Sequence, residues 1–158
     1  MSDEEKEFIK KVNIDKAKNK TILPIVLIIL SILTYVLPFI IYGEFDFGVV
    51  FESISLAFLL LARSYMSRYD EIRSKRYVSC SMLAIGWILI YDFMIICSYI
   101  QDALDLSLLG YEFLFIELCL ILYLIILFAI NRDLSKADNP VKYKESTDWF
   151  YETHKTDN

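Results

Sequence analysis

The sequence predicts an all-α integral membrane protein in which four transmembrane helices form an up-down bundle, with both termini on the cytoplasmic side. The first observation is composition, because 56% of the 158 residues are hydrophobic, which is high for a soluble domain of this size. The second is that these residues gather in four blocks, each long enough to cross a bilayer. The third is the distribution of charge.

The basic residues fall in three segments, 6–20, 63–76 and 132–155, and the loops after the first and third apolar blocks carry only acidic charges. Since Lys and Arg accumulate in cytoplasmic loops, we expect a multi-pass plasma-membrane protein with both termini and the middle loop in the cytoplasm. The many isoleucines and lysines of the sequence favour a bacterial origin. The predicted organisation is a cytoplasmic tail over 1–20, a transmembrane domain over 21–131 and a second cytoplasmic tail over 132–158.

A short helix is predicted in the N-terminal tail. Ser2 and Glu5 have the spacing of a capping box, and Glu7 and Lys11 have that of an i,i+4 ion pair. A weak apolar stripe would lie on one face of this helix, made of Phe8, Ile9 and Val12. Two arrangements are consistent with this pattern: the stripe rests on the membrane surface, or the segment remains a frayed tail.

The first span is predicted over residues 22–42. Pro24 lies in its first turn, where a missing N–H costs little, and Pro38 lies near its far end and frees the carbonyl group of Thr34. Polar residues recur at spacings of three, four and seven, which places them on one face of the helix. This stripe consists of Ser31, Thr34, Tyr35, Pro38 and Tyr42.

The second span is predicted over residues 47–65, with Glu52 in its second turn. Helical spacing places three further residues on the Glu52 face, namely Ser55, Leu59 and Ala62. We expect this helix to continue into the cytoplasm through residues 67–76, where Glu71 and Lys75 have the spacing of an ion pair.

The third span is predicted over residues 77–100 and carries Asp92 in its outer half. An ionised carboxylate at the centre of a transmembrane helix costs at least ~2.5 kcal/mol, so Asp92 is expected to face protein, water or a partner. Its face of the helix also holds Ser81, Ile85 and Tyr99.

The fourth span is predicted over residues 108–130, with Glu112, Cys119 and Tyr123 on one stripe. Glu117 lies about 140° round the helix from Glu112 at 100° per residue. Consequently this helix is buried on two sides, or one glutamate, for which Glu117 is the candidate, faces a second subunit.

The C-terminal tail carries two further signals. Asn139 and Pro140 are expected to end one helix and permit another. The aromatic run Trp149, Phe150 and Tyr151 is predicted to anchor the tail at the depth of the lipid headgroups. A docking peptide for a soluble partner is the alternative.

Four carboxyl groups would share the outer half of the membrane, roughly 5–12 Å below the outer ends of their helices. Three interpretations stay open: protonated acids that hydrogen-bond neighbouring helices together, a site for a proton, a hard metal ion or an organic cation, and pairing with a Lys or Arg of a partner. The candidate binding residues are Asp92, Glu52, Glu112, Glu117, Thr34 and Tyr99. The aromatic candidates for an organic cation are Tyr35, Tyr91, Tyr99, Tyr111 and Trp87.

Enzymatic motifs are missing from the sequence. The single histidine, His154, lies in the tail, and there is no GxSxG, HExxH or CxxC motif and only 4 glycines for a phosphate-binding loop. The three cysteines are dispersed in apolar blocks and are interpreted as small hydrophobic residues. We therefore expect no enzyme activity, no cofactor and no nucleic-acid partner, with carboxylate chemistry on a lipid as the remaining enzymatic alternative.

Two hypotheses about function remain. The first is a non-enzymatic accessory protein, such as an assembly subunit or an immunity-type protector, that works through its tails and a polar face within the lipid bilayer. The second is a cation-coupled transporter or cation-binding protein that depends on Asp92. Either one is compatible with a homodimer or a membrane-protein partner.

Overall fold

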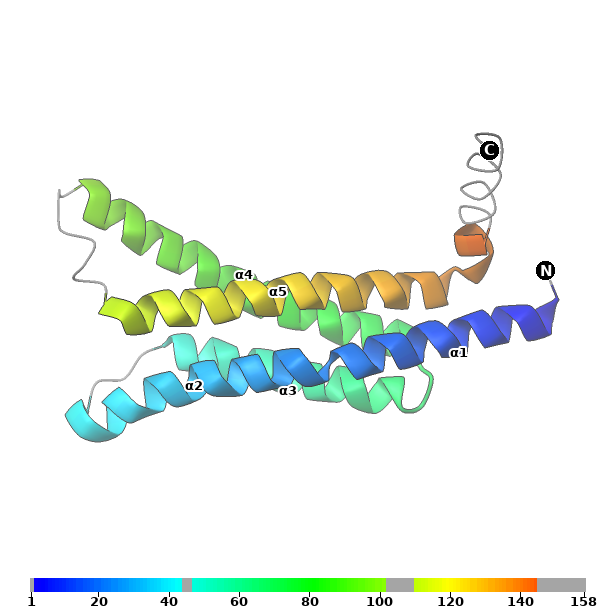
Figure 1. The fold of residues 1–158 in the computed structure, drawn as a ribbon, viewed down its shortest axis with the longest axis horizontal. Coiled ribbons are helices and arrows are strands. Elements are labelled where there is room, and N and C mark those ends of the chain that lie inside the picture. The colour runs from blue at the N-terminus through cyan, green and yellow to red at the C-terminus, as the bar shows by residue number, and fades with distance from the viewer. Residues whose placement is uncertain (1, 44–46, 102–109, 145–158) are drawn as a thin grey trace, which may run out of the picture.

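The computed structural model describes residues 2–43, 47–101 and 110–144, and these ranges contain helices and turns but no strand. Within these ranges, four helical stretches are long and apolar enough to cross a membrane. The first of these stretches, Asp3–Thr34, combines helix α1 with the first part of helix α2. The helices of the described ranges are α1 (Asp3–Lys20), α2 (Ile22–Tyr42), α3 (Gly48–Met66), α4 (Glu71–Gln101) and α5 (Gly110–Asp138) (Figure 1).

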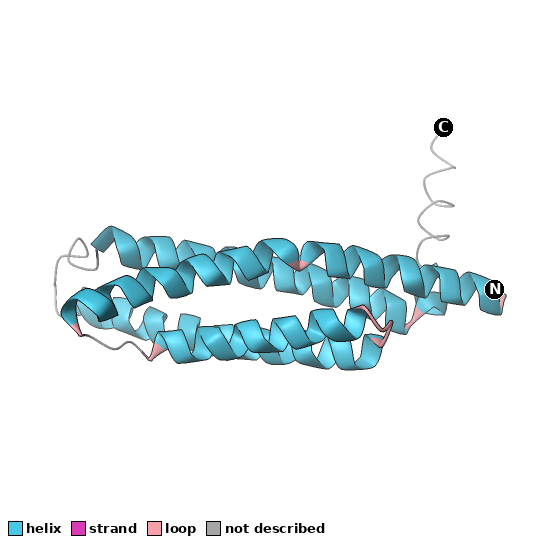
Figure 2. Cartoon of the chain, turned by 90° about the horizontal axis from the view of Figure 1, so that it is seen from below, coloured by secondary structure: helices cyan, strands magenta, loops and turns pink. Residues whose placement is uncertain are grey.

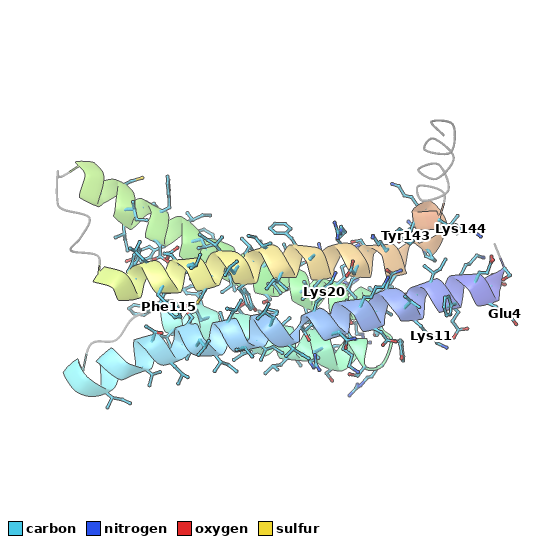
Figure 3. All side chains as sticks on the ribbon, viewed as in Figure 1. Glu4, Lys11, Lys20, Phe115, Tyr143 and Lys144 are labelled. Atoms are coloured by element: carbon cyan, nitrogen blue, oxygen red, sulfur yellow. The ribbon has the colours of Figure 1, made fainter. Side chains whose placement is uncertain are left out.

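The helices lie side by side along one long axis. α1 and α2 form a nearly straight rod, and α3, α4 and α5 lie beside it (Figures 1 and 2). The main packing partners are α3 with α4, α1 with α5, α4 with α5 and α2 with α5. The start of α1 and the end of α5 lie at the same end of the molecule, where Lys144 Nζ is 3.6 Å from Glu5 Oε2 (Figure 3).

The observed helices agree with the predicted spans in position but extend beyond two of them. α2 has the predicted bounds, and α3 lies within one residue of them. α4 already begins at Glu71, and α5 continues to Asp138, because their polar ends pack against other helices. Asn139 interrupts the helix as predicted, and residues 140–144 form a further helical turn.

The prediction that the second helix continues through residues 67–76 is wrong. α3 ends at Met66, and the chain reverses through Tyr69, whose φ of 55° lies in the left-handed region. α4 then begins under a cap in which the Oδ1 atom of Asp70 accepts a hydrogen bond from the Arg73 N–H at 3.0 Å. Residues other than glycine rarely adopt this φ. Since residues 67–76 contain neither Gly nor Pro, the sequence does not predict a turn there.

The predicted ion pair between Glu71 and Lys75 is also wrong, since each residue pairs with a different helix. Lys10 Nζ lies 2.7 Å from Glu71 Oε2, which joins α1 to the start of α4. Lys75 Nζ lies 3.2 Å from Asp138 Oδ2, which joins α4 to the end of α5. Contacts between helices have replaced the local pair that the spacing indicated.

The junction between α1 and α2 is held by further polar contacts. Lys20 Nζ lies 2.5 Å from the Oδ2 atom of Asp133 on α5. The guanidinium of Arg63 on α3 donates to the carbonyl oxygen of Lys18 at 2.8 Å and to Thr21 Oγ1. The three basic segments of the sequence therefore contact one another within the same half of the molecule, which we call the basic end (Figure 3).

The N-terminal helix has the cap that the sequence predicts. Ser2 Oγ accepts from the Glu5 N–H at 3.2 Å, and Glu5 Oε2 accepts from the Ser2 N–H at 3.0 Å, which forms a capping box. Lys11 Nζ lies 2.9 Å from Glu7 Oε1, as the spacing predicts.

α1 is a docked helix rather than a frayed tail. Ile14 and Ala17 are fully buried in the same apolar cluster as Leu134 and Ala137 of α5. Phe8, from the stripe expected to rest on a membrane surface, is 69% exposed. α1 thus packs on α5 through a different face from the one that the apolar pattern emphasised.

Candidate functional site

Three of the four predicted carboxyl groups come together between the helices. Glu52 on α3 is fully buried, Asp92 on α4 is 6% exposed, and Glu117 on α5 is half-buried. The charges of Glu52 and Asp92 both act on Glu117. Phe115, two residues before Glu117, lies in the half of the molecule away from Lys144 (Figure 3). The acids therefore lie in the half of the molecule opposite the basic end.

Glu52 is oriented by a side chain of α2. Ser31 Oγ donates a hydrogen bond to Glu52 Oε1 at 2.7 Å, and both residues are fully buried. Both lie on faces that the sequence predicts to be polar, and helix packing sets their relative register. This contact fixes Glu52 between α2 and α3.

Asp92 and Glu117 approach each other between α4 and α5, with their carboxyl groups in hydrogen-bonding contact. Oε1 of Glu117 is buried and meets no hydrogen-bond donor among the described residues. Ionised carboxylates only accept hydrogen bonds, so this contact becomes a hydrogen bond only when one of the two carries a proton. A hydrogen-bonded Asp92–Glu117 pair would therefore hold one proton.

The position of Glu117 bears on the question raised by the helical angle between the two glutamates of α5. Glu117 is half-buried and interacts with Asp92 of the same chain. α5 packs on α1, α2 and α4, so it is covered on more than one side. The side chain of Glu112 lies outside the described part of the structure, and the interpretation in which one glutamate faces a second subunit stays a prediction.

A separate polar cluster joins α3, α4 and α5. Ser55 Oγ and Ser81 Oγ lie 2.7 Å apart, and the hydroxyl of Tyr123 lies 2.9 Å from Ser55 Oγ and 2.7 Å from Ser81 Oγ. All three side chains are fully buried. We call this group the serine–tyrosine cluster. The sequence places each of the three residues on the same helix face as one of the predicted carboxyl groups. Whether the three side chains contact one another depends on the relative register of the helices.

A pocket of about 350 Å³ opens between α3 and α4 next to the acids. Its walls are aromatic and apolar except for one carboxyl group. They consist of Phe47, Gly48, Phe51, Trp87, Ile88, Tyr91 and Asp92. Asp92 thus borders both the pocket and Glu117. Trp87 and Tyr91 were among the sequence candidates, whereas Phe47 and Phe51 were missed, although their spacing of four is a visible signal.

Of the remaining predicted site residues, Thr34 has a described side chain, and its hydrogen bond is local. The hydroxyl of Thr34 donates to the carbonyl oxygen of Leu30 at 3.0 Å, within its own helix. The side chains of Tyr99 and Glu112 lie outside the described part of the structure, as does the whole predicted anchor of Trp149, Phe150 and Tyr151. Among described residues, no group of three or more His, Cys, Asp or Glu is arranged to hold a metal ion.

Comparison with known protein families, with curated proteins and with solved structures finds no match to this chain.

Proposed function

We propose that this chain is a four-span protein of the bacterial plasma membrane that binds a cation at Asp92 in exchange for the proton shared with Glu117. The observation that carries the proposal is the carboxyl pair itself, in which the buried Asp92 borders an open pocket and interacts with the half-buried Glu117. A protonated pair that a ligand can reach is the arrangement required for such an exchange.

The proposed orientation is an up-down bundle with both termini in the cytoplasm. It is supported by the basic end, where α1, the turn before α4 and the end of α5 are linked by ion pairs. Positive residues favour the cytoplasmic side of a membrane. The acidic group then lies in the outer half of the bilayer.

Charge balance explains why a cation and a proton would exclude each other at this site. With a proton, the pair carries one negative charge, and Glu52 nearby adds a further acidic group. When a cation binds to ionised Asp92, the proton leaves to solvent, so that one positive charge enters and one departs. The net charge of a weakly solvated site stays constant, which avoids the cost of leaving an added charge uncompensated.

The serine–tyrosine cluster counts against a purely structural role for the acids. It already joins α3, α4 and α5 through neutral hydrogen bonds, without a titratable carboxyl group. Carboxyl groups inside a membrane cost free energy. The Asp92–Glu117 pair adds this cost at an interface that neutral hydrogen bonds already hold together.

Proton release tests the proposal. Purified protein in detergent, in a weakly buffered solution with a pH indicator, is titrated with a panel of metal ions and organic cations. We expect saturable release of about one proton per chain with at least one cation, and its loss in Asp92→Asn.

Asp133→Asn is the matched control, since Asp133 is also buried but pairs with Lys20 at the basic end. This variant should release protons like the wild type. Absence of release across the panel, or equal release from Asp92→Asn, would overturn the proposed exchange.

Orientation is tested separately. A reporter fused after Asp105 should be active only outside the cytoplasmic membrane, and one fused after Lys75 only inside, because the positive residues are expected to stay in the cytoplasm. Reversed activities would contradict the orientation.

The accessory-protein hypothesis is favoured by a different observation, the length of α1. This helix carries charged residues along its exposed side while it packs on α5, so it presents an ordered charged surface. If the cation panel releases no proton, this surface is where partner binding would be tested.

A further inference from the structure

We propose that the pocket between α3 and α4 is a binding site for an organic ammonium ion, held by aromatic rings at its mouth and by Asp92 at its inner wall. This inference rests on the proposed function and names the class of cation that it would take.

The placement of the pocket residues supports a ligand that enters from the side of the bundle. The side chains of Phe47, Trp87 and Tyr91 are 75%, 66% and 64% exposed, whereas Asp92 is 6% exposed. The rings therefore surround the opening and the carboxyl group lies at depth. A ligand that enters passes the ring faces before its charge reaches Asp92.

Two pairs of aromatic residues at a spacing of four create this opening. Phe47 and Phe51 belong to one column at the start of α3, and Trp87 and Tyr91 to one column of α4. Residues four apart lie above one another on a helix. Ile88 and Asp92 form the adjacent inward column of α4 and are both buried. The opening is therefore formed by side chains of two facing helices and not by a single exposed side chain.

The chemistry of the walls distinguishes between kinds of cation. A hard metal ion needs about six oxygen ligands, whereas these walls offer one carboxyl group among rings and aliphatic atoms. An alkylated ammonium ion has apolar substituents and is attracted to the faces of Trp, Tyr and Phe. Negative charge on Asp92 provides the complementary charge at the inner wall. A volume of about 350 Å³ lies at the small end of the range for small-molecule pockets.

The test uses Trp87 as its reporter. Of the two tryptophans in the sequence, the other is Trp149, so Trp149→Phe leaves Trp87 as the sole tryptophan. This full-length protein is titrated in detergent with benzyltrimethylammonium and, separately, with neopentylbenzene, which has the same shape without the charge. We expect a saturable change of Trp87 fluorescence with the cation, and at least about tenfold weaker binding of the neutral compound.

Variants then separate the pocket from the rest of the aromatic surface. Tyr91→Ala should weaken cation binding by about threefold to thirtyfold, the range expected for loss of one cation–π contact. Phe93→Ala is the matched control, because Phe93 is 65% exposed on the same helix and does not line the pocket. It should leave the dissociation constant within about twofold of the parent value. Asp92→Asn should remove the preference for the charged compound.

The outcomes distinguish this inference from the proposed function. Proton release by metal ions, with no response of Trp87 to benzyltrimethylammonium, would overturn the ammonium site and leave the exchange at Asp92 in place. Equal binding of the charged and neutral compounds would show apolar partitioning and would also overturn it. A charge-selective response of Trp87 without proton release would support the pocket and contradict the exchange.

Discussion

Replacement of Tyr123 by alanine is expected to lower the free energy of unfolding by about 3 kcal/mol, the usual cost of removing a large aromatic side chain from a core. Tyr123 is fully buried on α5 and bonds to Ser55 of α3 and Ser81 of α4. Its loss leaves a cavity at the place where three helices meet. The two serines still bond to each other at 2.7 Å, so most of the loss comes from packing.

Titration with SDS in mixed micelles, followed by circular dichroism, would measure this change. Tyr123→Phe removes only the hydroxyl and should cost about 1 kcal/mol, typical of a buried hydrogen bond. Phe128→Ala is the matched control, because Phe128 lies on the same helix and is 58% exposed. It should have little effect on unfolding. Equal losses from Phe128→Ala and Tyr123→Ala would contradict the central position assigned to Tyr123.

The second large effect is expected at the basic end, where Arg63→Met should weaken the attachment of α1 to the bundle. The guanidinium of Arg63 donates to Lys18 O and to Thr21 Oγ1, at the point where α1 joins α2. Hydrogen bonds from a charged donor contribute about 1.5–3 kcal/mol when buried, and Arg63 is half-buried. A loss of about 1–2 kcal/mol would allow α1 to open separately from the apolar helices.

Hydrogen exchange read by mass spectrometry distinguishes local opening from global unfolding. In Arg63→Met, exchange should increase over residues 3–20 and stay low in the apolar parts of α3, α4 and α5. Arg68→Met is the control, since the guanidinium of Arg68 is exposed and lies 5.7 Å from the centre of the Tyr65 ring. Unchanged exchange of α1 in Arg63→Met would contradict the role assigned to the guanidinium.

Much of the helical fold could be predicted from the sequence, because apolar blocks and helix caps are local signals. The bounds of α2 and the capping box of Ser2 and Glu5 are examples. The turn at Tyr69 could not be predicted, since its left-handed conformation is rare for a residue other than glycine. The partners of Lys75 and Glu71 were mispredicted because a local spacing was outweighed by contacts from other helices.

The candidate site was predictable in its residues but not in its pairing. Helical periodicity placed Glu52 and Asp92 on inward faces, and both are buried. The contact of Asp92 with Glu117 depends on the relative rotation and register of α4 and α5, which side-chain spacing within one helix does not determine. The pocket likewise requires two helices to face each other, so the spacing of four between Phe47 and Phe51, which is visible in the sequence, does not by itself predict a pocket.

The ion pairs of the basic end have a consequence for how the chain is made. In the proposed orientation, Lys20 directs insertion of the first span, yet its partner Asp133 lies after the fourth span and is synthesised much later. The positive charge is thus unpaired while the ribosome is still delivering the early spans, and it is neutralised once the last helix arrives. The same holds for Lys75 and Asp138. In that orientation, residues that orient the nascent chain would become, after its completion, contacts that hold α5 beside α1 and α4.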